Sequence, residues 1–175
     1  MEISRADLIV ALRKIDPQKP YGQKLFDALA RLTVSVALEA VCLRLNSQSK
    51  KIEVYLARRS NQESAYPGEW HCPGTVIRPG EEFSSAFERL NRKEFGAKFL
   101  ETRFVANVNH PTEARGHFVS MVYLCVVGEG TKRVFLRGKW FPVDELPGKL
   151  VEFHQKMVIP VAIRDFLALP DSFNF

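Results

Sequence analysis

Residues 70–97 read WHCPGTVIRPGEEFSSAFERLNRKEFGA and contain a change from strand to helix. A short apolar run ends in the Pro-Gly pair at 73–74, and a tight turn follows at 78–80. A helical pattern then opens with two acids, the first of them Glu81, and stops at Gly96. Acids offset the positive end of a helix dipole, and glycine is a common residue just beyond the last turn. A strand, a glycine-containing loop and an acid-led helix form a layout suited to a phosphate–metal ligand.

This stretch resembles the Nudix box. That pattern consists of a glycine, five residues, a glutamate, seven residues and then Arg-Glu-apolar-any-Glu-Glu-any-Gly-apolar. Anchored on Gly96, the alignment needs no gap and matches four further positions of this chain: Glu81, Arg89, Glu94 and Ala97. The resemblance implies hydrolysis of a phosphoanhydride with a divalent metal, usually Mg²⁺. It also implies an α/β fold, an α/β/α sandwich around a mixed β-sheet.

Four positions of the box differ from the family pattern. Thr75 stands for the first glycine, Leu90 for the glutamate after the arginine, Asn91 for the apolar residue and Lys93 for the first acid of the Glu-Glu pair. Hard cations need oxygen ligands, and acids at i, i+3 and i+4 share one helical face. Here those positions hold Leu90, Lys93 and Glu94, and a lysine ammonium has no lone pair to offer a cation. The differences imply that metal-dependent pyrophosphohydrolase activity is weakened or lost.

The resemblance also indicates which residues would do the chemistry. Glu81 and Glu94 are the expected metal ligands, with the amide oxygen of Asn91 as a weak substitute. Arg89 would orient the acids through charge-assisted hydrogen bonds, beside Glu94 as the catalytic carboxylate. Glu113 is the candidate for a base or further ligand from a later loop; the alternative is a solvated loop acid. The cofactor is Mg²⁺ or Mn²⁺ if the protein is active, and none if the activity is lost.

Four basic residues are candidates for binding the substrate. Arg58 and Arg59 end a strand, and in the family such a pair often lies near the substrate; the alternative is a charged strand end. Lys93 could neutralise a nucleotide phosphate directly, where the family uses a metal. Arg115 precedes residues 117–127, a stretch similar to one found in ADP-ribose and nucleoside-diphosphate hydrolases.

Two classes of function remain open. One is a hydrolase of nucleoside-diphosphate-linked compounds, of the ADP-ribose, nucleotide-sugar or nucleoside-triphosphate type. The other is a catalytically inactive module on a Nudix fold, which binds a nucleotide or another protein. Metal-dependent binding would favour the first, and nucleotide binding that ignores EDTA would favour the second.

The rest of the chain divides into an N-terminal helical extension, residues 1–32, and a Nudix-like domain, residues 33–175. Periodicity predicts helices at 4–15 and 21–32, which pack on the sheet, form a homodimer surface or cover the ligand site. It predicts strands at 33–45 (bulged near Glu39), 52–58, 99–108, 117–127 and 134–136, and a loop at 109–116. The phrase WFPVDELP at 140–147 resembles a second recurring Nudix phrase, and the helix predicted at 151–167 is expected to kink at Pro160.

Composition limits the partners and the location. The chain has 175 residues, a net charge of +5 and a pI of about 9.2, which favours nucleotide-type small molecules. The excess of charge is modest, so a solvated basic surface is preferred to a nucleic-acid track. Three widely spaced cysteines indicate reduced core residues, and no apolar run is long enough to span a membrane. A cytoplasmic protein is expected.

Overall fold

The computed structural model describes residues 3–96, 98–127 and 138–169. The α-helices are α1 (Arg5–Arg13), α2 (Gln23–Ala30), α3 (Phe83–Leu90) and α4 (Ile159–Leu167), and two π-helical turns are η1 (Asn91–Phe95) and η2 (His154–Val158). The strands are β1 (Val34–Val41), β2 (Leu43–Leu45), β3 (Ile52–Arg58), β4 (Trp70–His71), β5 (Gly74–Val76), β6 (Phe99–Glu113), β7 (Gly116–Val127) and β8 (Gly138–Pro142). Residue 97, the strand expected at 134–136 and the tail from 170 lie outside the described residues.

The described part of the chain forms two four-stranded sheets. The first has the order β5-β1-β7-β6, in which β1 and β7 are parallel and the other neighbours are antiparallel. In the second, β3 pairs with β8 on one side and with β2 and β4 on the other. The expected mixed β-sheet is confirmed, but the strands are divided between two sheets, and the parallel pair lies in the first.

The long strand predicted at 33–45 is divided between these two sheets. β1 ends at Val41 and β2 begins at Leu43, so that the chain passes from one sheet to the other at Cys42. The carbonyl of Cys42 accepts a hydrogen bond from the N–H of Tyr55 at 3.0 Å. The bulge predicted near Glu39 is wrong, because this residue pairs in regular register with strands on both sides.

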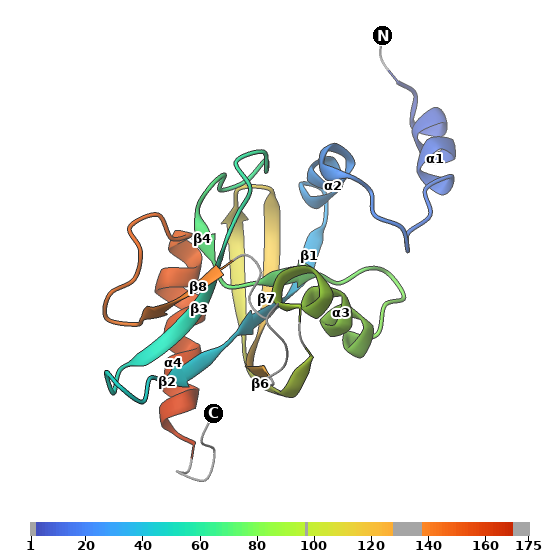
Figure 1. Cartoon of the computed structure of the whole chain (residues 1–175). Helices are drawn as coiled ribbons and strands as arrows, with labels where there is room; N and C mark the ends of the chain where they lie inside the picture. The colour runs from blue at the N-terminus through green and yellow to red at the C-terminus, as the bar shows by residue number, and fades with distance from the viewer. Residues whose placement is uncertain (1–2, 97, 128–137, 170–175) are drawn as a thin grey trace.

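The sheets lie between two helical layers, with α3 on one side and α4 on the other (Figure 1). Val54 and Leu56 of β3 belong to the core cluster that contains Ile159 of α4. The alternate residue Tyr55 belongs to the cluster that contains Leu90 of α3. Burial of both faces explains why β3 is buried at successive positions. The predicted α/β/α sandwich is confirmed.

The segment 109–116, predicted as a loop, is mostly strand. β6 continues to Glu113, where this residue pairs with Gly116 of β7. Only Ala114 and Arg115 form the turn of the hairpin. The polar residues of this segment hide the strand in the sequence, because its stability comes from pairing with β7 and not from an apolar pattern. The hairpin holds Glu113 and Arg115 at one end of the sheet.

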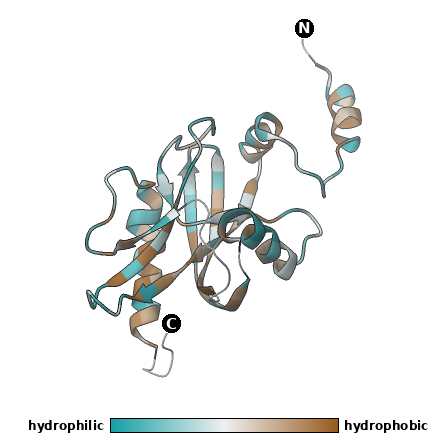
Figure 2. Cartoon of the chain, viewed as in Figure 1, coloured by the Kyte–Doolittle hydropathy of each residue, from teal (hydrophilic) through white to brown (hydrophobic). Residues whose placement is uncertain are grey.

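The N-terminal extension contains two helices that differ in their packing. Both are shorter than predicted, and Ser4 caps α1 by accepting a hydrogen bond from the N–H of Asp7 at 3.1 Å. α1 lies away from the rest of the molecule and mixes hydrophobic with hydrophilic residues (Figures 1 and 2). α2 packs on the domain, where Ala30 is buried and Phe26 lies against Phe118.

The helix predicted at 151–167 contains a π-helical turn before its proline, Pro160. The π-helical turn η2 leads into α4, and Pro160 lies in the first turn of α4, where proline is tolerated. Val158 and Ile159, at this junction, are fully buried in the core. No helix among the described residues is long and apolar enough to cross a membrane.

Candidate functional site

A pocket of about 230 Å³, here the central pocket, opens at one end of the two sheets. Its lining comes from β1, the end of β3, β5, η1, the β6–β7 hairpin and η2. Six of the residues predicted from the sequence line it: Arg58, Arg59, Lys93, Glu94, Glu113 and Arg115. Arg89 lines a neighbouring pocket, and Glu81 and Asn91 line neither of the two.

The box helix ends in the π-helical turn η1, which brings Lys93 and Glu94 to the pocket. The N–H of Gly96 donates to the carbonyl of Asn91 at 2.8 Å, and Gly96 adopts the left-handed conformation (φ 70°) expected of a glycine stop. Glu94 is buried, whereas Lys93 is exposed. The Nζ of Lys93 lies 3.2 Å from Oε1 of Glu94. The ammonium is therefore the ion-pair partner of this carboxylate.

The first acid of the box, Glu81, holds the turn at 78–80 that precedes α3. Glu81 accepts two hydrogen bonds from Arg89, at 2.8 Å from Nε and 2.7 Å from Nη2, and one from the N–H of Arg78 at 3.0 Å. These hydrogen bonds, the one from Arg89 first, hold the pKa of Glu81 below its usual value. Arg89 also donates to Thr75 Oγ1 and to the carbonyl of Val76. Arg89, paired with Glu81, therefore joins α3 to β5.

The residues present do not fit a Nudix metal centre. In the described ranges, no group of three His, Cys, Asp or Glu residues is placed to hold a metal ion. Leu90 is buried in the core, Lys93 pairs with Glu94, and Glu81 is occupied by Arg89. Asn91 is buried, and its Oδ1 has no hydrogen-bond partner within the described part of the chain.

A buried carboxyl group that sequence reasoning missed lies in the central pocket. Ser120 Oγ donates to Oε1 of Glu39 at 3.3 Å, and Oε2 has no hydrogen-bond partner among the described residues. A Cβ at Gly74 would lie only 2.2 Å from Oε2, so the glycine leaves room for the carboxyl. Burial raises the pKa of Glu39 to about 8. The available signal is a single acid within an otherwise apolar strand, a pattern that also fits a bulge.

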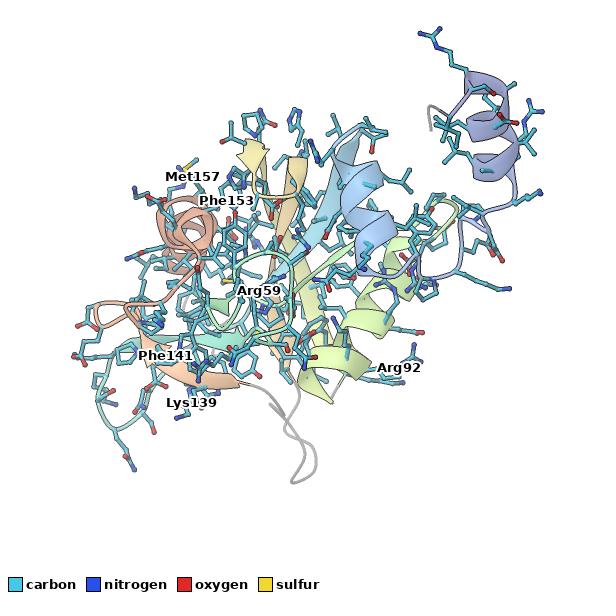
Figure 3. All side chains as sticks on the ribbon, turned by 90° about the horizontal axis from the view of Figure 1, so that it is seen from above. Arg59, Arg92, Lys139, Phe141, Phe153 and Met157 are labelled. Carbon is cyan, nitrogen blue, oxygen red and sulfur yellow. The ribbon has the colours of Figure 1, made fainter. Side chains whose placement is uncertain are left out.

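Arginines line the pocket beside this carboxyl. Arg59 donates from Nε to the carbonyl of Ala65 at 3.0 Å and pairs with Glu63. Burial lowers the pKa of Arg59, and Glu63 opposes that change. In Figure 3, Arg59 lies in the middle of the molecule between the two helical layers, whereas Arg92 points outward.

The hairpin adds a second, rigidly held arginine. Arg115 Nη2 lies 3.2 Å from Oε1 of Glu113, and its own N–H donates to Oε2 at 2.6 Å. Its guanidinium also lies 5.2 Å from the ring centre of Phe118 and 5.6 Å from that of Phe26. These contacts hold the guanidinium over the edge of the pocket.

Histidines, which the sequence analysis did not assign to the site, complete the lining. His154 Nδ1 accepts a hydrogen bond from the N–H of Cys72 at 2.9 Å, which requires a neutral ring with its proton on Nε2. Burial is the main cause that lowers the pKa of His154 to about 3, and it also lowers the pKa of His71. The ring of His110 stacks on Phe153 at 3.9 Å. Nothing in the spacing of these histidines indicated that they meet.

The comparisons with known proteins agree with this fold. A family model of the NUDIX domain matches residues 37–159, and the chain therefore belongs to the Nudix family, whose members generally use divalent metal ions. A comparison with curated protein sequences finds no match.

Several solved structures are similar to this chain. A MutT/nudix family protein from Enterococcus faecalis is 15% identical with a TM-score of 0.62, and the match covers 95% of this chain and 70% of that chain. The Nudix domain of Shewanella oneidensis NrtR complexed with ADP ribose is 19% identical with a TM-score of 0.60, and covers 94% and 99%. A MutT NUDIX hydrolase from Burkholderia pseudomallei is 21% identical with a TM-score of 0.55, and covers 74% and 95%. At such identities the likeness concerns the fold alone.

Proposed function

We propose that this protein binds a nucleoside-diphosphate-linked compound with its diphosphate at the central pocket, and that its metal-dependent pyrophosphohydrolase activity is weakened or lost. The observation that carries the proposal is the position of Lys93, whose Nζ lies 3.2 Å from Glu94 in a pocket that Arg59 and Arg115 also line. Three cationic side chains can neutralise a diphosphate directly. Guanidinium groups bind phosphate oxygens through paired, charge-assisted hydrogen bonds.

The pairing of these cations explains how they can be present before a ligand binds. Arg59, Lys93 and Arg115 each have a carboxylate partner, respectively Glu63, Glu94 and Glu113. A diphosphate would replace or share those carboxylates. ADP-ribose is the first compound to test, because the NrtR Nudix domain, which has a similar fold, was solved with it. Nucleotide sugars and nucleoside triphosphates share the required chemistry.

Hydrolysis would require more carboxylates than the box supplies. Glu94 and Glu113 are the predicted catalytic acids that reach the pocket, and each is paired with a basic side chain. If Mg²⁺ or Mn²⁺ supports any cleavage of ADP-ribose, we expect it to be slow and to depend on Glu94. The variant Glu94→Gln should abolish that residual turnover; wild-type turnover in the variant would refute the assignment of Glu94.

Calorimetric titration of ADP-ribose into the purified protein tests the binding proposal. The titration is done once with EDTA and once with Mg²⁺ or Mn²⁺. We expect the same dissociation constant in both, because side chains and not a metal neutralise the phosphates. Binding that occurs only with the metal would contradict the proposal and favour a working Nudix metal centre. Absence of binding under both conditions would contradict it as well.

A further inference from the structure

A second pocket, here the N-terminal pocket, adjoins the central pocket and has a volume of about 460 Å³. Its lining includes Tyr21, Phe26 and Asp27 from the N-terminal extension. The two pockets share part of their lining, and the shared part includes Arg59, Lys93 and Arg115. The cations proposed to bind the diphosphate therefore lie between two spaces and not at the end of one.

The N-terminal extension is fixed where it forms this pocket. A Cβ at Gly116 would lie 2.1 Å from the carbonyl oxygen of Ala30, so the end of α2 packs directly on the backbone of the hairpin. Arg78 Nη1 donates to the carbonyl of Gln18 at 3.3 Å, which ties the loop before α2 to the loop of the box. Residues 16–30 thus close one side of the ligand site, which is one of the three roles left open by the sequence.

The lining of the N-terminal pocket has the chemistry of a nucleoside site. Tyr21 and Phe26 offer aromatic surface for a base. The Oδ1 of Asp27 is buried and has no hydrogen-bond partner in the described part of the chain. A buried acceptor without a partner costs free energy, and a hydroxyl or amino group of a ligand would remove that cost.

The central pocket has a different character. Its carboxyl, Glu39, is hydrogen-bonded to Ser120 and retains a buried oxygen without a partner among the described residues. Its volume of about 230 Å³ is below the roughly 300 Å³ at which pockets begin to hold drug-sized ligands. It therefore suits a small hydroxylated group, such as one sugar, and not a whole nucleoside-diphosphate compound.

We propose that the N-terminal pocket binds the nucleoside half of a two-part ligand, and that the linked sugar enters the central pocket against Glu39 and Ser120. The diphosphate between them lies across Arg59, Lys93 and Arg115. This assignment rests on the proposed function and deepens it, because it makes the N-terminal extension a part of the binding site.

Titrations with ADP-ribose, ADP and ribose 5-phosphate in EDTA test the assignment. Two variants alter the N-terminal pocket, Asp27→Ala in α2 and Tyr21→Ala in the preceding loop. The matched control is Lys24→Ala, an exposed position of α2 that lines neither pocket. Alanine favours helix, so Asp27→Ala should fold, and the melting temperature of each variant verifies this.

Both variants should weaken binding of ADP-ribose and ADP about tenfold or more, and change ribose 5-phosphate less than twofold. Glu39→Ala, which removes the carboxyl altogether, should show the opposite pattern, weakening ADP-ribose and ribose 5-phosphate but not ADP. If wild-type protein binds ADP-ribose and folded variants of Asp27 and Tyr21 bind ADP equally well, the nucleoside assignment is wrong and the proposed function stands. If wild-type protein does not bind ADP-ribose, the proposed function fails and this assignment fails with it.

Discussion

The Nζ of Lys93 lies 3.2 Å from Oε1 of Glu94, so adjacent residues of the same π-helical turn form an ion pair at the mouth of the central pocket. Glu94 is buried and Lys93 is largely exposed. A cation at this position attracts phosphate and repels a metal ion. Under the proposed function, Lys93 therefore binds a phosphate of the ligand where other members of the family use a metal ion.

Replacing Lys93 with glutamine should weaken binding of ADP-ribose about threefold to tenfold, measured by titration calorimetry in EDTA. The loss is modest because the side chain is exposed and solvent screens its charge. The dependence of affinity on salt should also become shallower, since one cation fewer contacts the phosphates. Arg92→Gln is the matched control, because Arg92 points outward (Figure 3). Equal losses in the two variants would indicate a general effect of surface charge.

The ion pair between Arg89 and Glu81 should stabilise the fold. Both side chains are mostly buried, and the arginine forms hydrogen bonds with Glu81, Thr75 and Val76. Arg89→Met should lower the free energy of unfolding by about 2–4 kcal/mol, because it leaves the Glu81 carboxylate poorly compensated. Urea denaturation measures this change.

The control for that variant is Lys51→Met, which removes exposed ion pairs to Asp144 and Glu145. Exposed pairs contribute about 0–1 kcal/mol, so this variant should unfold close to the wild type. A loss for Arg89→Met as small as that for Lys51→Met would show that the box arginine does not stabilise the loop.

The fold was predictable from the sequence because its signals are local. Residues 52–58 were predicted as a strand and form β3 with the same limits, and Gly96 ends the box helix as expected. The division of residues 33–45 at Cys42 was not predictable, because it depends on which sheet each half joins. The same holds for β6, whose polar end is strand only because β7 lies beside it.

The candidate site was predictable only in part. Basic residues such as Arg59 and Lys93 were found because their charge stands out in the sequence, and they do line one pocket. Glu39 and His154 were missed, since their importance comes from burial and from partners such as Ser120, 81 residues away. Glu81 matched the box, yet the structure shows both of its oxygens in hydrogen bonds.

Acid should destabilise the protein through its buried histidines. The pKa of His154 is about 3 in the folded state, below its ordinary value of 6.5, so the unfolded state binds more protons between these values. The contribution of neutral His154 to the free energy of unfolding is complete above pH 6.5 and should fall as the pH decreases, by about 1 kcal/mol per pH unit. His154→Gln, whose amide oxygen can still accept from the N–H of Cys72, should reduce this slope in urea denaturation from pH 7 to pH 4. An unchanged slope would show that His154 is not protonated on unfolding.

Glu39 should have the opposite effect on the pH dependence. Its pKa is about 8 in the folded state, above the ordinary value of 4.5, so the folded state retains a proton that the unfolded state loses. The associated stability is complete below pH 4.5 and is lost as the pH rises towards 8. Glu39→Gln removes this pH dependence. The free energy of unfolding of the variant, relative to that of the wild type, should therefore rise between pH 5 and pH 8, by about 1 kcal/mol per pH unit.

A matched control for Glu39→Gln is Glu53→Gln, another buried glutamate with the opposite shift. Burial opposes the ionisation of Glu53, but hydrogen bonds from Asn46 and Arg44 hold its pKa below 4.5. Its ionised form is therefore favoured in the folded state, and Glu53→Gln should lose stability at every pH from 5 to 8. If Glu39→Gln gave the same flat loss, Glu39 would be ionised in the folded protein. In that case the central pocket would present a carboxylate to its ligand, which would repel a phosphate and accept a hydrogen bond from a sugar hydroxyl.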